Sequence, residues 1–352
     1  MKISTIVDAK EKRVAITPET VKKYIAAGLE VVLPRNCGVT AGFWDADYVA
    51  AGAKIDAAAL PKAELYVAVK PSFEKDIKLK SGSHLIALLS PAKNEKSLKK
   101  LADGGVSLYS LEKIPRITRA QSMDVLSSQA NIAGYRAVLE ALYHYGRVAP
   151  LMMTAAGTVR PARVLVLGAG VAGLQAIATA KRLGAVVQAF DVRASVKDQV
   201  ESLGAGFISP EENENGETAA GYAKEMSLEY QKGLREKLSQ AIASMDVVIT
   251  TAQVPGKPAP LLITEEMVQS MPAGSVIVDL ATETGGNCPL SRENEVVVWE
   301  NVTILGTSNL AAKLAQDSSQ LFARNVFNFV SLMTKNDQID ASDEIVSAAL
   351  LK

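Results

Sequence analysis

The sequence predicts an α/β protein with two sets of α/β units on parallel sheets, and three observations carry that prediction. Helical apolar periodicity alternates with short apolar runs along most of the 352 residues. In several places a glycine separates the helical part from the apolar run, as in units that feed a parallel sheet. The stretch VLVLGAGVAGLQAIATAKRLGAVVQAFDV adds a strand, a glycine turn, a helix, a second strand and an acid, in that order.

The helix-to-strand units define two sets along the chain. The units are VKKYIAAGLEVVL, LKKLADGGVSLYSL, AKRLGAVVQAF and MPAGSVIVDL. Residues 1 to about 125 form the first set and about 160 to 308 the second. A long amphipathic helix is predicted from Ser127 to about Gly146, and SSQLFARNVFNFVSLM predicts a C-terminal helix that folds back on the first domain. The expected domains are 1–126 plus 312–352, and 127–311.

Composition excludes several function classes. Lys plus Arg and Asp plus Glu both number 38, so net charge indicates neither nucleic-acid binding nor a polybasic membrane patch. Only Cys37 and Cys288 are present, which argues against a disulfide framework or a zinc cluster and favours two buried thiols in a reducing compartment. No apolar stretch approaches the ~20 residues of a membrane span, and the start MKISTIVDAKEKR is too charged for a secretory signal. We therefore expect no direct membrane insertion, and any membrane role to come through a partner.

The three glycines of the turn have separate expected roles. Gly168 allows a tight strand-to-helix turn, Gly170 lets the backbone approach a pyrophosphate, and Gly173 lets the helix lie close to the sheet. The N–H groups at the start of the helix then face an anion. This combination predicts a dinucleotide site.

The acid at the end of the second strand predicts the choice of coenzyme. The carboxylate of Asp191 can accept hydrogen bonds from both ribose hydroxyls and would repel a 2′-phosphate, which favours NAD(H) over NADP(H). Arg193 is the counter-argument, because a guanidinium near the ribose can bind that phosphate. It follows a carboxylate instead of replacing one, so NAD(H) remains the prediction.

Two further segments leave alternatives open. Residues 208 to 238 are polar and longer than a compact α/β connection needs, which fits either a mobile flap, placed at about 208–230, or a surface excursion. In PRITRAQSMDVLSSQANIAGYRA, residues 115 to 137, polar side chains suit a carboxamide, which needs both donors and acceptors. The same residues also fit an N-capped helix entrance with Asp124 or Ser127 as the cap. Composition alone does not separate these two interpretations.

Several long motifs in one order resemble the NAD(H)-binding domain, or alpha subunit, of proton-translocating NAD(P) transhydrogenase. They are the 115–137 loop, AAGTVRPARVLVLGAGVAGLQAIATAKRLGA, GYAKEM, VPGKPAPLLITEEMV and GSVIVDLATETGGNCPLS. The resemblance covers nearly the whole chain and is densest from 113 to 306. It implies two Rossmann-like domains joined by long helices, with a cleft between them and NAD(H) bound by the second.

Family roles transfer only to the matching positions. The resemblance implies that Arg116, Gln121, Asp124 and Ser127 contact the nicotinamide and act as the catalytic residues. The other implied cofactor-binding residues are Ile117, Thr118, Ser122, Met123, Gly168, Gly170, Val171, Gly173, Asp191, Val192, Arg193, Gly221, Tyr222 and Gln253. Gly221 and Tyr222 fall on the family's mobile loop. Gln253 stands where the family often has Leu, so we expect an altered adenine contact there.

Alanine dehydrogenase is the neighbouring family, and this chain departs from its catalytic pattern. That family uses a Lys before Glu-Pro and a His in an apolar strand, whereas this chain has Val69 and Leu88 at those positions. Of its two histidines, His84 is expected to cap or decorate a loop and His144 to lie on the linking helix. Without the imidazole, a general acid for a carbonyl oxygen is missing. Arg13 in EKRVAITP can hold a carboxylate, but a structural ion pair is the favoured interpretation.

The functional expectation is a component that presents NADH to NADP(H) bound on a partner. The resemblance implies NADP(H)-binding and membrane-spanning partner subunits, a homodimer, and a peripheral position on the cytoplasmic or matrix face of a membrane. No metal site is expected, because the two histidines and the motifs assemble no ligand cluster. A soluble alanine-type dehydrogenase and a non-catalytic NAD(H)-sensing module are the alternatives.

Overall fold

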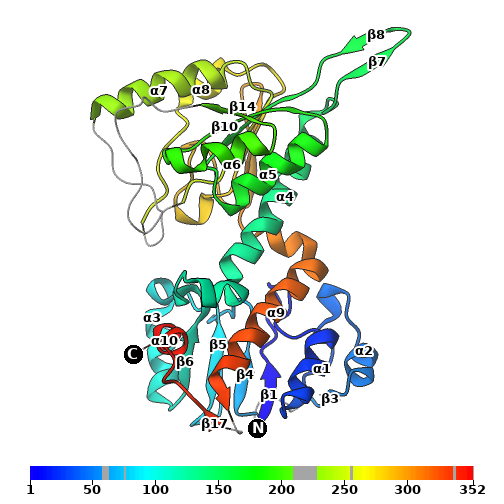
Figure 1. Ribbon diagram of the computed structural model, residues 1–352, viewed down its shortest axis with the longest axis vertical. Helices are drawn as coiled ribbons and strands as arrows, with labels where there is room; N and C mark the ends of the chain where they lie inside the picture. The colour runs from blue at the N-terminus through cyan, green and yellow to red at the C-terminus, as the bar shows by residue number, and fades with distance from the viewer. Residues whose placement is uncertain (58–62, 75–76, 209–227, 254–256, 336–337, 352) are drawn as a thin grey trace. The chain divides into compact units, whose positions relative to one another are not determined.

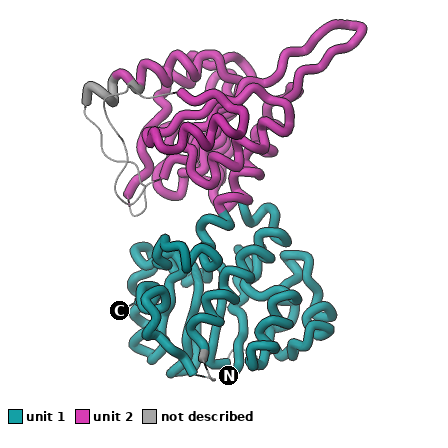
Figure 2. The backbone as a smooth tube through the Cα atoms, in the orientation of Figure 1, with its two compact units in different colours: residues 1–129, 311–352 teal, residues 130–310 magenta. Residues whose placement is uncertain are grey.

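The computed structural model describes residues 1–57, 63–74, 77–208, 228–253, 257–335 and 338–351. The chain forms two compact units, which Figure 2 shows in different colours. Unit 1 consists of Met1–Gln129 and Ala311–Lys352, and unit 2 consists of Ala130–Leu310. Unit 1 is therefore built from two separate stretches of the sequence, and α4 (Val125–Tyr145) begins in it and continues into unit 2.

Unit 1 contains a six-stranded parallel sheet in the order β3-β2-β1-β4-β5-β6. Its strands are β1 (Lys2–Thr5), β2 (Glu30–Leu33), β3 (Lys54–Ile55), β4 (Leu65–Val67), β5 (His84–Ala87) and β6 (Ser107–Ser110). The register pairs Ile3 with Leu65 and Val67 with Ile86. The strand order reverses between β1 and β4, so the carboxyl ends of these two strands form a topological switch point.

The helices of unit 1 cover both faces of this sheet. They are α1 (Pro18–Ala26), α2 (Asp45–Ala50), α3 (Pro91–Asp103), α9 (Ala315–Met333) and α10 (Glu344–Ala349). Val21 of α1 and Phe322 of α9 are buried in one core with Val67, whereas Leu98 of α3 packs with Leu85 in a second core. Helix α9 lies beside α1 in Figure 1, so the C-terminal segment completes the N-terminal sheet. A short antiparallel pair, β16 (Thr334–Lys335) and β17 (Gln338–Ile339), follows α9.

Unit 2 contains a seven-stranded sheet in the order β11-β10-β9-β12-β13-β15-β14, of which only β14 is antiparallel. Its strands are β9 (Arg163–Leu167), β10 (Val186–Phe190), β11 (Gly206–Ile208), β12 (Val247–Thr250), β13 (Val276–Asp279), β14 (Glu295–Trp299) and β15 (Val302–Gly306). Here the order reverses between β9 and β12. The glycine turn that follows β9 therefore lies at a switch point, where open α/β sheets bind ligands.

Helices again lie on both faces of the second sheet. They are α5 (Val171–Arg182), α6 (Lys197–Ser202), α7 (Leu228–Ile242) and α8 (Glu265–Ser270). Residues of α4, α5 and α6 pack in one core, and residues of α7 and α8 pack in the other. A hairpin of β7 (Met152–Thr154) and β8 (Gly157–Val159) extends away from the rest of the unit (Figure 1).

The predicted fold class is confirmed: both units are α/β with Rossmann-like parallel sheets. The four predicted helix-to-strand units, the linking helix and the C-terminal helix are all present. Among the described helices, none combines the length and the apolar character that crossing a membrane requires.

Two local expectations were wrong. The excursion predicted over 208–238 ends earlier, because α7 begins at Leu228 and Ile208 still belongs to β11. Its middle part, 209–227, lies outside the described residues, as do Gly221 and Tyr222. His84 decorates no loop but is the first residue of β5, where its ring lies beside that of Tyr109 at a centroid distance of 6.0 Å. A strand position suits an aromatic ring with an apolar neighbour better than the spacing alone indicated.

Candidate functional site

The glycine turn after β9 has the conformation that its spacing predicts. Gly168 has a φ of +98°, and a Cβ there would lie 2.7 Å from Thr251 Oγ1. A Cβ on Gly173 would overlap the carbonyl oxygen of Gly168, so α5 packs directly against the turn. A Cβ on Gly170 would meet nothing within 4 Å. The first and third glycines are thus required by packing, and the second borders open space of the kind that a phosphate needs.

The N-terminus of α5 is available to an anion. Gly170 is the N-cap residue, and no side chain caps the helix there. The first turn of α5 also carries no acidic side chain. Helix N-termini bind phosphates through their free N–H groups and the helix dipole. The turn therefore offers the recognition elements expected for a pyrophosphate, and Val171, the first helical residue, is exposed beside it.

Asp191 follows β10 and is only 6% exposed. Its Oδ2 accepts hydrogen bonds from the N–H of Ala169 at 2.7 Å and from Arg193 Nη2 at 2.8 Å. Its Oδ1 accepts from the N–H and from Nε of Arg193, both at 2.9 Å. Both oxygens already have partners in the chain itself. Ribose hydroxyls reach this carboxylate only if the Arg193 guanidinium moves aside.

Polar groups from the neighbouring strands meet the glycine turn from the other side of the switch point. The Thr251 hydroxyl donates to the Gly168 carbonyl at 2.9 Å, and Gln253 Nε2 donates to the Leu280 carbonyl at 2.9 Å. Asn287 Nδ2 donates to the carbonyls of Ala252 and Pro260 at 2.9 and 2.7 Å, while its Oδ1 is buried without a hydrogen-bond partner among the described residues. An orphaned buried acceptor at a switch point fits a site that a polar ligand completes.

Thr251 and Asn287 were missed by the sequence analysis. A usable signal was present for Thr251, which directly follows the apolar run VVIT at the carboxyl end of β12. No comparable local signal marks Asn287, because it joins the turn only through hydrogen bonds to backbone far away in the sequence.

The segment predicted to contact a nicotinamide lies in unit 1 and is anchored from below. It forms a 3₁₀ turn from Thr118 to Met123, in which Ala120 and Met123 are buried in the core. The residues whose side chains remain exposed are Arg116, Ile117, Thr118, Gln121 and Ser122. Because the Met123 side chain is 7% exposed and packs in the core, only its backbone is available to a ligand.

Asp124 acts as the cap of α4. Its carboxylate accepts hydrogen bonds from the N–H of Ser127 at 2.9 Å and from the Ser127 hydroxyl at 2.5 Å. The helix-entrance interpretation of this segment is therefore correct for Asp124. It does not exclude a binding loop, because the capping fixes the two side chains in one arrangement and leaves both partly exposed.

Neighbouring groups confirm the structural interpretations that the sequence left beside the functional ones. Arg13 forms a buried ion pair with Glu11 at 2.8 Å. It lines a cavity of about 70 Å³ at the carboxyl ends of β1 and β4, which is far below the volume that drug-sized ligands occupy. Both cysteines are free and buried, and burial raises the pKa of the Cys37 thiol to about 12 and that of Cys288 to about 11. The described residues contain no group of His, Cys, Asp and Glu that holds a metal ion.

Comparisons with known proteins agree along the whole length of the chain. The family models described as "Alanine dehydrogenase/PNT" match residues 6–133 with the N-terminal domain and 137–352 with the C-terminal domain. The first of the proteins that make up the NAD(P) transhydrogenase alpha subunit in Rhodospirillum rubrum is 49% identical over 352 residues, covering 96% of this chain and 92% of that protein. Its namesake from Rickettsia prowazekii is 46% identical, covering 97% and 91%. A solved structure of transhydrogenase from Sinorhizobium meliloti has a TM-score of 0.92 and 44% identity, covering 100% of this chain and 98% of that one.

Proposed function

This chain belongs to the alanine dehydrogenase/PNT family, among the relatives named as alpha subunits of NAD(P) transhydrogenase, and from that premise we propose that it binds NADH and presents it to NADP⁺ held by a partner. One observation in the structure supports the proposal most directly. The uncapped α5 follows a glycine turn with open space at Gly170, and a carboxylate, Asp191, stands at the end of the next strand. This is the donor and acceptor set that a dinucleotide requires.

Each portion of NADH has proposed partners in this chain. The pyrophosphate lies on the turn of Gly168, Gly170 and Gly173, with Val171 beside it. The adenosine ribose is held by Asp191, next to Val192 and Arg193, and the adenine lies near Gln253. The nicotinamide is oriented by Arg116, Gln121, Asp124 and Ser127, with Ile117, Thr118, Ser122 and the Met123 backbone around it. Gly221 and Tyr222 belong to the same proposed set.

The chemistry asks these residues to position the coenzyme and not to exchange protons. In the proposed reaction a hydride passes from C4 of NADH to C4 of the NADP⁺ nicotinamide, which leaves NAD⁺ and NADPH and needs no proton. Direct transfer requires the two carbons to approach to about 3–3.5 Å. The protein contributes orientation, and the coenzyme contributes the reactive bond. Asp124 and Ser127 suit this role, because they are locked to each other by two hydrogen bonds before any ligand binds.

The remaining elements of the proposal concern assembly. We propose that an NADP(H)-binding subunit and a membrane-spanning subunit that carries protons complete the enzyme, with this chain peripheral on the cytoplasmic or matrix face. A homodimer is also proposed. The β7–β8 hairpin supports it: every residue of its two strands is exposed, including Met153 at 77%, and an isolated two-stranded hairpin is at best marginally stable in water.

An alanine-dehydrogenase-like activity is the second candidate, and two observations weigh against it. Val69 and Leu88 occupy the positions of that family's Lys and His. Arg13, the remaining candidate for holding a carboxylate, already donates to Glu11 and to Gln129. Turnover of NADH with pyruvate and ammonia by this chain alone would overturn the transhydrogenase proposal in favour of this activity.

The deciding experiment mixes the purified chain with an NADP(H)-binding subunit from a related transhydrogenase and follows hydride exchange between NADH and an NADP⁺ analogue by absorbance. We expect exchange that depends on both proteins. Calorimetric titration of the chain alone is expected to give clear binding of NADH and much weaker binding of NADPH. NADH binding without any exchange would identify a sensing module, and preferred binding of NADPH would contradict the assignment of Asp191.

A further inference from the structure

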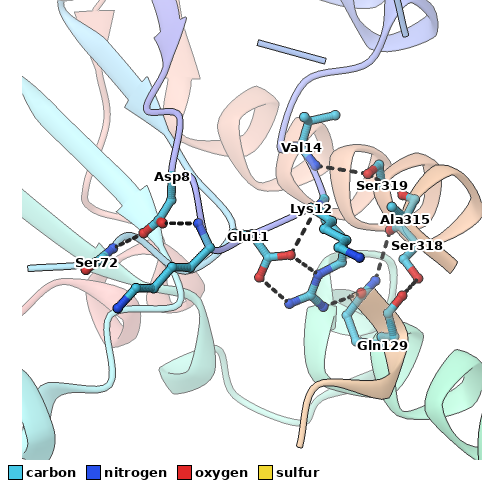
Figure 3. A network of polar contacts seen from close by, with 12 residues as sticks. Asp8, Glu11, Lys12, Val14, Ser72, Gln129, Ala315, Ser318 and Ser319 are labelled. Carbon is cyan, nitrogen blue, oxygen red and sulfur yellow. Dashed lines mark hydrogen bonds and ion pairs between the residues drawn. The ribbon is translucent and has the colours of Figure 1, made fainter. Parts of the chain in front are cut away.

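A buried polar network in unit 1 joins the segment before α1 to the start of α4. The side chains of Glu11 and Arg13 are 8% and 5% exposed and form a two-point ion pair, with Nε to Oε1 at 2.9 Å and Nη2 to Oε2 at 2.8 Å. The third nitrogen of the guanidinium, Nη1, donates to Oε1 of Gln129 at 2.7 Å. Figure 3 shows Glu11 and Gln129 facing each other across this network.

The same network continues into α9. Gln129 Nε2 donates to the carbonyl of Ser318 at 3.1 Å, and the Ser318 hydroxyl donates to the carbonyl of Ala311 at 2.6 Å (Figure 3). A parallel contact runs from the N–H of Val14 to the hydroxyl of Ser319 at 2.9 Å. Gln129 is therefore held at both ends of its amide, by the buried guanidinium and by the backbone of α9.

Stability alone is a poor explanation for this arrangement. Desolvating two charges costs about as much as their attraction returns, so a buried ion pair is roughly equivalent to a well-packed apolar pair. What the network adds over apolar packing is direction, because each of its hydrogen bonds fixes a distance and an angle. The groups whose position it fixes therefore indicate its purpose.

Those groups belong to the first turns of α4. Gln129 follows Asp124 and Ser127 within the same helix start, and Asp124 caps that helix through Ser127. A rigid helix transmits the position of one side chain to its neighbours in the adjacent turn. A shift of α4 that broke the Gln129 hydrogen bonds would displace Asp124 and Ser127 with it.

A second contact from α9 holds the other end of the same segment. The amides of Asn325 and Asn328 both donate to the carbonyl of Ser122, at 2.8 and 2.9 Å. Helix α9 thus supports the segment on both sides of Asp124, at Ser122 through two amides and at Gln129 through Ser318. This shared support gives the segment one defined position relative to the core of unit 1.

From these contacts we infer that Arg13 and Gln129, with Glu11 as the buried counter-ion, are positioning residues that set the place of Asp124 and Ser127. The inference rests on the proposed function, because it names what orients the residues that orient the nicotinamide. A misplacement of about 1 Å in a hydride-transfer geometry lowers the rate by up to ~100-fold. Binding of the coenzyme, which the glycine turn supplies from its own hydrogen-bonding groups, is much less sensitive.

The test compares three variants with the wild type in single-turnover hydride exchange with the NADP(H)-binding partner. Gln129→Met keeps the length of the side chain and removes both hydrogen bonds. Glu11→Leu with Arg13→Met replaces the ion pair by apolar side chains and removes the contact to Gln129 in a second way. Val21→Ala is the control, because Val21 is buried in the same core and its side chain makes no polar contact with the segment.

We expect Gln129→Met and the double variant to lower the exchange rate by about 10- to 100-fold while the dissociation constant of NADH changes less than about threefold. Val21→Ala should lower the melting temperature and leave the exchange rate near that of the wild type. Equal losses of exchange in all three variants would reduce the network to a structural role and overturn the inference. So would a folded Gln129→Met or a folded double variant with the wild-type rate.

The same measurement separates this inference from the proposed function. If the wild type exchanges no hydride with the partner, the proposed function fails and the inference fails with it. If the wild type is active and the network variants are equally active, only the inference fails.

Discussion

The two units share one sheet topology, yet their first connections at the switch point are built from different chemistry. In unit 2, β9 runs into α5 through Gly168, Ala169 and Gly170. In unit 1, β1 runs into α1 through residues 6–17, a stretch without glycine. The long connection folds its own polar side chains, including Glu11 and Arg13, into the space above the sheet.

The helix ends differ in the same way. The N-terminus of α1 is capped by Thr17, which forms a capping box with Thr20, and its first turn carries Glu19. The N-terminus of α5 has neither a side-chain cap nor an acidic side chain in its first turn. A capped, acidic helix start has little left to offer an anion, whereas an uncapped one still has its N–H groups. The comparison teaches that topology provides a switch point in both units, and that the first connection decides whether a nucleotide fits there.

The largest expected effect breaks unit 2 at its turn. In Gly173→Ala the new Cβ would overlap the carbonyl oxygen of Gly168, so the helix must move away from the sheet. We expect a loss of about 4 kcal/mol or more in the free energy of unfolding, measured by urea titration, and no detectable NADH binding by calorimetry. Gly170→Ala is the matched control, because its Cβ meets nothing within 4 Å. It should fold normally and bind NADH weakly; wild-type stability of Gly173→Ala would contradict the packing argument.

The next effect concerns the charge at the end of β10. Asp191→Asn removes the negative charge that accepts the ribose hydroxyls and repels a 2′-phosphate, at the cost of a charged hydrogen bond of about 2 kcal/mol. We expect NADH affinity to fall roughly 30-fold in calorimetric titration, with relaxed discrimination against NADPH. Asp198→Asn, an exposed position on α6, serves as the control and should change neither affinity. Unchanged selectivity in Asp191→Asn would remove Asp191 from the ribose site.

The third variant uncaps the helix that corresponds to α5 in unit 1. Thr17→Ala removes the cap of α1, which costs about 1 kcal/mol in the free energy of unfolding. For a unit of this size, we expect the melting temperature to fall by about 2–4 °C. NADH binding should stay unchanged, because the space above β1 remains filled by Glu11 and Arg13. A new nucleotide affinity in this variant would show that the cap alone separates the two units.

The smallest effect comes from the acid in the first turn of α1. The hydrogen bonds of Arg324 and then of Lys23 to the Glu19 carboxylate lower its pKa. Since the folded pKa lies below the unfolded value near 4.3, the stabilisation is fully present above that pH and is lost as the pH falls through the folded pKa. All three side chains are largely exposed, so Glu19→Gln should cost less than about 1 kcal/mol at pH 7 and progressively less as the pH falls below about 4. Denaturant titrations at pH 7 and in acid check this, and an effect that survives about 1 M salt would contradict it.

Much of the fold and some of the site followed from local patterns. The glycine spacing predicted the turn at Gly168 and the close packing at Gly173, because a strand that enters a helix so tightly leaves few backbone solutions. Periodicity predicted α4 and α9 for the same local reason. The start of α7 was missed, since its polar, glycine-containing surroundings resemble a connection. The position of His84 in β5 was missed because a single residue at a strand end carries no periodic signal.

The sequence by itself determined the two α/β cores and the glycine turn, because apolar periodicity and glycine spacing act over a few residues and need no distant partner. Tertiary structure alone decided which polar groups are already paired. Arg13 meets Gln129 from a distant region of the chain, Asn287 donates to the backbone of Ala252, and α9 supports Ser122 from the C-terminal stretch. Hydrogen-bond partners of this kind are chosen by how the sheets and helices pack, and sequence spacing holds no record of that choice.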